Sequence, residues 1–477
     1  MGRFATDYFL SSLATPVGYP RQLKQTERRR VSGGHDVPIF TNFPPNRSFY
    51  PVNSRRHFLH RAAALALAPQ LKPFAEADLF SIKSAFSDQT PEQVARNEDF
   101  WVPIQQAFTT STGILNLNNG GVSPAPKVVQ DALERYNHYA NEAPSYFMWR
   151  IMDQGREPLR ESMAALAGVQ PGEIAFNRNA TEALDTIIFG LPLRAGDEVV
   201  LSRYDYPNMI HAWRQRELRD GIKLKYVDVK LPSENETALT SAYVEQFSPR
   251  TKIVHVTHLV NWTGQILPAA RIAREAHRRG IEVLVDGAHS FAHLDYKIPD
   301  LECDYFGTSL HKWLCAPIGS GMLWMKREKI ASVFPLIAND KPQSDDIRKF
   351  ENLGTRSFPI EQAVSQALRF HEAIGSARKA ARLFYLKNHW AERAAQIPGV
   401  KLFTSLKREF SGALCLVGVE GLEPGPLEGQ LLGRFKIHTS PITWEDLRGV
   451  RVTPHLYTTL PDLDRLVDAL GKLAKRA

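Results

Sequence analysis

The chain has 477 residues, 43% of them apolar, and a formal net charge of +8 at pH 7. A chain of this length can bury one large core or two, and the statistics of protein classes favour a large α/β unit with a smaller domain. The charge is local: residues 1–75 hold eleven Lys/Arg and three Asp/Glu, which leaves 48 residues of each sign in residues 76–477. The basic pI is therefore no evidence of a nucleic-acid footprint, and no nucleic-acid partner is expected.

Cysteine content and hydropathy exclude two further classes. Three cysteines, Cys303, Cys315 and Cys415, are too few for a disulfide framework, and free thiols are expected. No apolar run approaches the ~18 residues that a membrane span needs. We expect a soluble chain without a membrane span and without a metal site.

The N-terminal region resembles an export signal. Paired arginines, Arg55 and Arg56, lie in the stretch Asn-Ser-Arg-Arg-His-Phe-Leu at 53–59, which a short Ala/Leu stretch follows at 62–69. This is similar to a twin-arginine signal at 53–75 and predicts a periplasmic or exported protein, or a cytoplasmic one if the signal is not used. Because Pro-, Arg- and Ser-rich residues precede it, residues 1–52 are expected to be disordered or to lie upstream of the true start. The alternative is a basic tail ahead of a short helix.

Beyond the signal, residues 76–115 are expected to form an N-terminal arm, in which Thr90 caps a helix with Pro91 in its first turn. Strand-like segments then alternate with segments of helical length and period, which is typical of a doubly wound, mainly parallel sheet. We expect this large domain at 116–355 and a smaller C-terminal α/β domain at 356–477. The predicted strands are Glu173–Phe176, Glu198–Leu201, Lys223–Val229, Lys252–Val260, Glu282–Asp286, Tyr305–Thr308 and Gly321–Met325.

Two turns in the large domain are candidates for contact with a ligand. At 114–124, an apolar run is broken by paired glycines after Asn119, and Gly120 allows a close approach of the backbone. At 177–186, a polar turn opens a helix near Ala180 and Thr181, and a helix N-terminus presents free N–H groups to an anion. A plain turn and an ordinary capped helix are the alternatives.

A carboxylate and a lysine form the most informative pair. Asp286 ends an apolar run, at the carboxyl end of a predicted parallel strand, where ligands of open α/β sheets bind. Lys312 follows 26 positions later. A lysine amine forms a Schiff base with a carbonyl cofactor, and a carboxylate on the pyridine nitrogen makes pyridoxal phosphate (PLP) an electron sink. Taken alone, each residue is more often a solvated charge or a cap.

The neighbours of Lys312 favour the catalytic interpretation. Ser309 and His311 precede it in a Ser-x-His-Lys pattern that resembles the signature of class V (fold type I) aminotransferases, and residues 311–321 are most similar to the isopenicillin N epimerase-like branch. The resemblance runs from about Asn116 to the C-terminus. It implies a fold type I PLP-dependent transferase in which Lys312 carries PLP while Ser309 and His311 help to hold its phosphate.

The same resemblance implies roles for other positions. Those that would contact the cofactor are Ala180 and Thr181 at the phosphate, Tyr206 stacked on the ring, Asn261 and His289 near the ring oxygen, and Gly354 and Thr355 reaching the PLP phosphate of a partner subunit. Those that would contact the substrate are Asn119 and Gly120 at the border of its pocket and Arg451, whose guanidinium can bind a carboxylate bidentately. A homodimer with shared active sites and a small amino acid substrate are therefore expected.

Several functions stay open within this family. Cysteine desulfurases need a nucleophilic cysteine on a mobile loop, and neither Cys315, next to the lysine, nor Cys415, in an apolar run, has that setting. We expect a PLP enzyme acting at the Cα of an amino acid by epimerisation, transamination or loss of a β-substituent. A cysteine desulfurase or C–S lyase is one alternative. The other is a non-catalytic exported scaffold, against which the joint presence of Lys312 and Asp286 argues.

Overall fold

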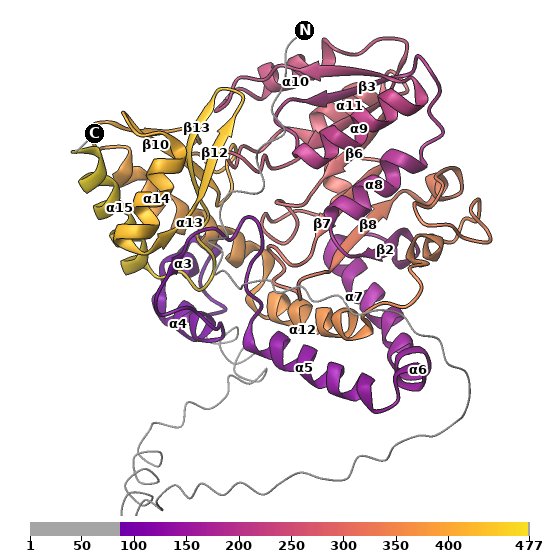
Figure 1. Cartoon of the computed structure of the whole chain (residues 1–477), viewed down its shortest axis with the longest axis horizontal. Helices are drawn as coiled ribbons and strands as arrows, with labels where there is room; N and C mark the ends of the chain where they lie inside the picture. The colour runs from indigo at the N-terminus through magenta and orange to yellow at the C-terminus, as the bar shows by residue number, and fades with distance from the viewer. Residues whose placement is uncertain (1–85, 476–477) are drawn as a thin grey trace, which may run out of the picture. The chain divides into compact units, whose positions relative to one another are not determined.

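The computed structural model describes residues 86–475, so the predicted extension at 1–52 and the predicted signal at 53–75 lie outside the described residues (Figure 1). The α-helices are α3 (Pro91–Arg96), α4 (Glu98–Gln106), α5 (Lys127–Glu142), α6 (Pro144–Tyr146), α7 (Arg156–Ala167), α8 (Ala180–Gly190), α9 (Pro207–Asp220), α10 (Glu236–Val244), α11 (Ala269–His277), α12 (Phe358–Ile374), α13 (Ser376–Ala394), α14 (Pro424–Phe435) and α15 (Leu460–Ala474). The strands are β1 (Leu115–Asn116), β2 (Ile174–Asn177), β3 (Glu198–Ser202), β4 (Lys223–Val227), β5 (Thr251–Thr257), β6 (Glu282–Asp286), β7 (Tyr305–Ser309), β8 (Gly321–Met325), β9 (Val400–Leu402), β10 (Cys415–Val419), β11 (Ile437–His438), β12 (Ser440–Trp444) and β13 (Leu447–Val452).

The large sheet has seven strands in the order β2-β8-β7-β6-β5-β3-β4. All neighbours are parallel except β8, which is antiparallel to both β2 and β7. All seven predicted strands occur, and their bounds differ from the predicted ones by a few residues at most. The predicted doubly wound, mainly parallel sheet is confirmed.

Each face of this sheet is covered by helices. Side chains alternate along a strand, so Val283 and Val285 of β6 join the core beneath α11 and α12, whereas Leu284 joins the core beneath α8 and α9. A strand that is buried on both faces requires apolar residues at nearly every position, which explains the continuous apolar run before Asp286.

A second, antiparallel sheet has the order β12-β13-β10-β9, and Trp390 of α13 and Leu466 of α15 pack in its core. The short strand β1 pairs in parallel with β11, and Asn118 bridges to Thr453. Residues 115–120 are thereby joined to the C-terminal part of the chain, beside β13. The predicted domain boundaries at 116, 355 and 356 stay predictions.

Three further predictions concern a helix cap, the cysteines and membrane spans. Thr90 caps α3, with Pro91 in the first turn, as predicted. Cys303, Cys315 and Cys415 are buried free thiols, as predicted. Between residues 86 and 475, no helix is both long and apolar enough to cross a bilayer.

Candidate active site

The candidate site lies at the carboxyl edge of the large sheet. Asp286 ends β6 and is in register with Thr257 of β5 and Gly307 of β7. Its side chain is buried, and Oδ1 accepts a hydrogen bond from the Ala288 amide at 2.8 Å. Burial raises the pKa of Asp286, while the Ala288 amide and the charge of Lys312 lower it. A cation beside this carboxylate would favour its ionised form.

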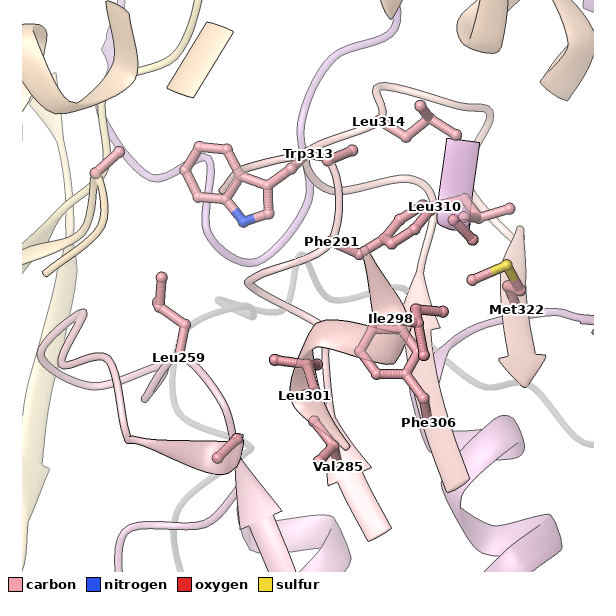
Figure 2. Close-up of a cluster of buried hydrophobic side chains, with 14 of the residues drawn as sticks. Leu259, Val285, Phe291, Ile298, Leu301, Phe306, Leu310, Trp313, Leu314 and Met322 are labelled. Atoms are coloured by element: carbon pink, nitrogen blue, oxygen red, sulfur yellow. The ribbon is translucent and has the colours of Figure 1, made fainter. Parts of the chain in front are cut away.

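The lysine segment is anchored by apolar side chains on both sides of Lys312. Leu310, Trp313 and Leu314 belong to the cluster of buried apolar side chains that Figure 2 shows. The Trp313 ring stacks on His293 with ring centroids 3.8 Å apart. Because these neighbours are fixed by packing, the backbone at Lys312 is held rigidly with respect to β6 and β7.

Lys312 is partly buried, and its Nζ lies 3.2 Å from Nε2 of His289. Burial lowers the pKa of Lys312 to about 8, with the positive charge of Arg451 acting in the same direction and Asp286 opposing it. Burial also holds the pKa of His289 well below its usual value, so this imidazole is neutral. A larger fraction of the Lys312 amine is therefore neutral at physiological pH than for an exposed lysine.

The predicted phosphate residues meet at the N-terminus of α8. The Ser309 hydroxyl, at the end of β7, accepts a hydrogen bond from the Ala180 amide at 2.9 Å, and Thr181 follows in the same first turn. A Cβ at Gly321, which pairs with Ser309, would lie 2.6 Å from the backbone of Asn179, so only glycine permits this close approach.

His311 is the fourth predicted phosphate residue, and its ring is partly buried. Its Nδ1 lies 3.0 Å from the carbonyl oxygen of Ser320. Because a carbonyl can only accept, this contact puts the ring proton on Nδ1. Burial lowers the pKa of His311, which favours the neutral ring.

Arg451 of β13 supplies a buried positive charge. Its guanidinium donates to the Asn261 carbonyl at 2.8 Å and to the Asn118 side chain at 3.2 Å, while Nε has no hydrogen-bond partner among the described residues. Burial lowers the pKa of Arg451 to about 10, and Tyr206 opposes that shift. A Cβ at Gly120 would lie 3.3 Å from the guanidinium carbon, so the predicted glycine turn does border this charge.

Asn119, the other predicted residue of this turn, has hydrogen-bond partners within the protein. It is fully buried, donates to the Thr453 carbonyl at 2.8 Å and accepts from the Tyr457 hydroxyl at 2.6 Å. The Asn119 side chain therefore joins the 115–120 segment to the residues after β13, and this contact holds Gly120 close to Arg451.

The remaining predicted site residues are Asn261, Tyr206, Gly354 and Thr355. Asn261 is buried, and its Oδ1 has no partner within the described part of the chain. Tyr206 precedes α9 and is 40% exposed. Gly354 and Thr355 lie on an exposed loop, and Thr355 lines a cavity whose wall includes Ser320 and Gly321. The structure thus brings Lys312 together with Asp286, His289 and Arg451, but it leaves the 354–355 pair outside that group.

These groups match the parts of PLP. The Lys312 amine suits its aldehyde, the Asp286 carboxylate suits its pyridine nitrogen, and the first turn of α8 suits its phosphate. Buried atoms of Asn261 and His289 lack partners among residues 86–475, as expected for groups that meet a bound molecule.

Asp205, which the sequence prediction missed, is fully buried near Asp286. Its two oxygens accept from the Ser202 amide at 2.7 Å and the Thr257 hydroxyl at 2.6 Å. Burial raises the pKa of Asp205 to about 7, despite the Thr257 hydrogen bond, and the charge of Asp286 adds to the rise. The available signal was an acidic residue just beyond a buried parallel strand, the same signal that identified Asp286.

An aromatic contact between the small sheet and the loop after β5 was also missed. Trp444, at the end of β12, stacks on Trp262 with ring centroids 4.9 Å apart and donates from Nε1 to the Arg203 carbonyl at 2.8 Å. Asp446, in the same hairpin, accepts from the Tyr204 hydroxyl. The hairpin that leads into the strand of Arg451 is thereby fastened to the loop that carries Tyr206.

The sheet order and a partly buried lysine at its carboxyl edge define a fold type I α/β enzyme. Residues 115–440 match the family model described as "Aminotransferase class-V". The chain therefore belongs to the class V aminotransferase family, whose members are PLP-dependent enzymes, as the Ser-x-His-Lys pattern predicted.

Individual proteins agree with this assignment. Isopenicillin N epimerase of Streptomyces clavuligerus is 30% identical over 391 residues, which cover 78% of this chain and 98% of the epimerase. A cysteine desulfurase of Synechococcus elongatus is 28% identical over 78% of this chain and 62% of its own. Among solved structures, the cystine C–S lyase in complex with cysteine persulfide has a TM-score of 0.68 at 24% identity and covers 76% of this chain and 98% of its own. The cysteine desulfurase of Thermococcus onnurineus has a TM-score of 0.70 at 20% identity, with 78% and 98% covered.

Proposed function

We propose that this PLP enzyme transfers a proton at the Cα of an α-amino acid whose carboxylate binds to Arg451. The observation that carries the proposal is that three groups meet at one edge of the sheet: a lysine with a lowered pKa, the carboxylate at the end of β6, and a buried arginine whose Nε has no partner among residues 86–475. A guanidinium can bind a carboxylate with two parallel hydrogen bonds, which fixes the orientation of Cα.

Each residue has a distinct task in this scheme. Bound PLP supplies an electron sink for the charge that develops at Cα. Asp286 holds a proton on the pyridine nitrogen through its negative charge. The Lys312 amine would take or return the proton at Cα, and a pKa near 8 suits both directions at neutral pH.

Isopenicillin N epimerases match this chain over nearly their whole length, and so do some cysteine desulfurases. Epimerisation is the reaction that we favour, because it needs no group beyond those at this site. Transamination and β-elimination share the same first proton transfer. A desulfurase would need a reactive thiolate, but Cys315 and Cys415 are buried, and burial raises the pKa of both, that of Cys415 to about 11.

We further propose a homodimer. The loop with Gly354 and Thr355 is exposed, and so are the large apolar side chains of Trp149 and Ile318. Covering such side chains would favour association of two copies. The molar mass in solution, measured by light scattering, tests this: a monomer that retains full activity would contradict it.

Export by the twin-arginine route is a separate proposal, supported by the sequence around Arg55 and Arg56. Arg55→Lys with Arg56→Lys should retain the protein in the cytoplasm. A wild-type protein found wholly in the cytoplasm after cell fractionation would contradict export and leave the catalytic proposal intact.

Proton exchange tests the catalytic proposal before the product is known. In D₂O, the substrate should exchange its Cα–H for deuterium with wild-type protein, and Lys312→Ala should abolish the exchange. A panel of L- and D-amino acids with chiral chromatography then separates epimerisation from transamination and elimination. A protein that binds PLP but exchanges no member of the panel would favour the scaffold alternative.

A further inference from the structure

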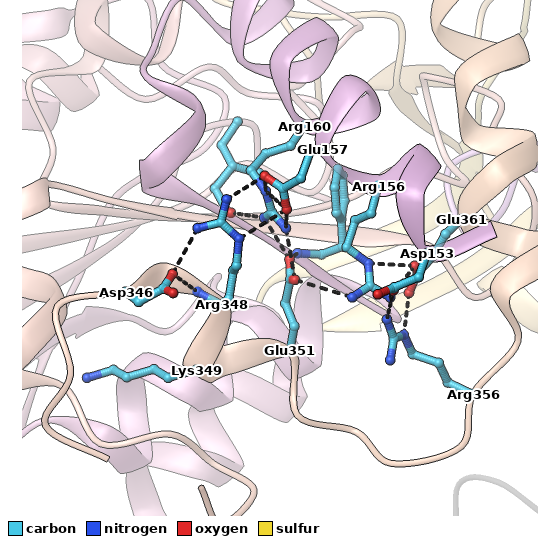
Figure 3. Close-up of polar contacts among 12 residues, drawn as sticks. Asp153, Arg156, Glu157, Arg160, Asp346, Arg348, Lys349, Glu351, Arg356 and Glu361 are labelled. Carbon is cyan, nitrogen blue, oxygen red and sulfur yellow. Dashed lines mark hydrogen bonds and ion pairs between the residues drawn. The ribbon is translucent and has the colours of Figure 1, made fainter. Parts of the chain in front are cut away.

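A network of charged residues joins the N-terminal turn of α7 to the segment 346–361, as Figure 3 shows. Its members are Asp153, Arg156, Glu157, Arg160, Asp346, Arg348, Glu351, Arg356 and Glu361. None of them belongs to the lysine cluster. However, its members lie on both sides of the loop that carries Gly354 and Thr355: Glu351 precedes the loop, and Arg356 and Glu361 follow it.

One end of that loop is fixed by Glu351. Arg160 is fully buried and donates to both carboxylate oxygens of Glu351, at 2.8 and 2.9 Å. The Phe176 amide of β2 donates to the same carboxylate at 2.7 Å. The start of the loop is therefore tied both to α7 and to the large sheet.

The other end is fixed by Glu361 of α12. Arg356 donates from Nε to one oxygen of Glu361 at 2.6 Å, and Arg156 donates to the other oxygen at 2.8 and 3.0 Å. Both guanidinium groups also lie over the Phe358 ring, at 4.6 Å for Arg356 and 5.6 Å for Arg156. Glu361 thus joins two arginines on opposite sides of one carboxylate.

The loop between these two anchors borders a cavity beside the first residues of β8. Leu353 and Thr355 line a cavity together with Ser320 and Gly321, and Gly321 pairs with Ser309. Gly354 has φ +65°, a left-handed conformation that glycine adopts readily. A short exposed loop of this kind would lose order without anchors at both ends.

Buried ion pairs are costly to desolvate and are weak devices for stability alone. Here they hold the two ends of one loop. We propose that the pairs Arg160–Glu351 and Arg156–Glu361–Arg356, here called the loop clamp, hold residues 352–355 in position for the contact with the partner subunit's PLP phosphate that the class V resemblance implies. This inference rests on the proposed PLP enzyme and its homodimer. Arg156 and Glu361 are positioning residues in it, since they act through the loop.

Glu361→Gln tests the clamp, because it preserves side-chain size and removes the charge that both arginines share. The dissociation constant of PLP, measured by adding PLP to the apoenzyme, should rise about tenfold or more, as expected when a charged hydrogen-bonded pair loses one charge. Arg348→Ala is the matched control. Arg348 precedes Glu351 in the same segment, but its partners Glu157 and Asp346 are about half exposed, so its loss should leave PLP affinity within about twofold.

Mixed dimers test the action across the interface. One subunit carries Glu361→Gln with an intact Lys312, and the other carries Lys312→Ala with an intact clamp. If the loop serves the partner, the mixed dimer has one tight site, seen as PLP that borohydride fixes to Lys312 at low PLP concentration. A mixed dimer with only weak sites would overturn the action across the interface.

The outcomes separate this inference from the proposal beneath it. Wild-type protein that never binds PLP at Lys312 would overturn the proposed function. Wild-type protein that binds PLP, together with Glu361→Gln of unchanged PLP affinity, would overturn the clamp alone. Should Glu361→Gln fail to fold, Arg356→Gln removes the same link from the loop side, and unchanged PLP affinity in that variant would count equally against the clamp.

Discussion

The Nζ atom of Lys312 lies 3.2 Å from Nε2 of His289; the imidazole is buried, the lysine is partly buried, and Arg451 adds a positive charge nearby. Burial lowers the pKa of Lys312, the guanidinium adds to that shift and Asp286 opposes it, so more of the amine is neutral than in an exposed lysine. The lysine is therefore prepared for nucleophilic attack on an aldehyde.

This arrangement predicts how the apoenzyme takes up PLP at different pH values. The pKa of Lys312 is lowered to about 8 in the folded protein, so the reactive neutral amine is scarce below pH 8. The rate of uptake should rise about tenfold per pH unit below that value and level off above it, whereas free Nα-acetyl-lysine should continue to gain up to ~10.4. Stopped-flow absorbance measures both. An enzyme rate that still rises between pH 9 and 10 would contradict the lowered pKa.

Asp286→Asn should reduce the rate far more than the stability. The amide oxygen can still accept the hydrogen bond from Ala288, but the charge that holds a proton on the pyridine nitrogen is lost. We expect kcat to fall by roughly two orders of magnitude or more. If Asp286 were only a strand-end cap, its loss would cost about 1 kcal/mol of stability and spare turnover.

Asp300→Asn is the control for that variant. The Asp300 carboxylate also accepts a backbone N–H, from Lys297 at 2.8 Å, but it is exposed and is not one of the residues of the candidate site. Its kcat should equal that of the wild type. Thermal midpoints and kcat of both variants, measured side by side, decide between the two roles of Asp286.

Arg451→Lys should weaken substrate binding without weakening PLP binding. Lysine keeps the charge but cannot make the bidentate contact with a carboxylate. We expect KM for the amino acid to rise about tenfold or more, with the PLP dissociation constant unchanged. Arg448→Lys, at an exposed position of the same strand, should change neither. A rise in KM that occurs equally in both variants would remove the assignment.

The contact between Trp444 and Trp262 predicts that KM rises in proportion to how much of the contact a Trp444 variant loses. Trp444→Ala removes both the ring stack and the hydrogen bond to Arg203, so the hairpin that leads to Arg451 should move more freely and KM should rise. Trp444→Phe keeps an aromatic stack and should have a smaller effect. Steady-state kinetics check the order, and equal KM values in all three proteins would show that the hairpin does not control Arg451.

Much of the sheet could be predicted because its signals are local. The apolar run at 283–285 indicated a strand buried on both faces, and the acidic residue that ends it had to lie at the carboxyl edge. Lys312 was identified because Ser309 and His311 stand beside it in the chain. The same rule applied to the end of β3 would have identified Asp205.

Contacts between distant segments could not be predicted in this way. The pairing of Leu115 with Ile437 brings Gly120 next to Arg451, and no local pattern indicates which strands a two-residue segment will join. Likewise, Arg160 and Glu351 are ordinary charged residues in the sequence. They become a buried pair only when α7 packs against the sheet.

The most direct test of the account is to reduce the holoenzyme with borohydride and map the modified peptide. The account predicts one reduced pyridoxyl group per chain, located on Lys312, and its loss in Lys312→Ala. A pyridoxyl group on another lysine of the wild-type protein, or none on any, would contradict it.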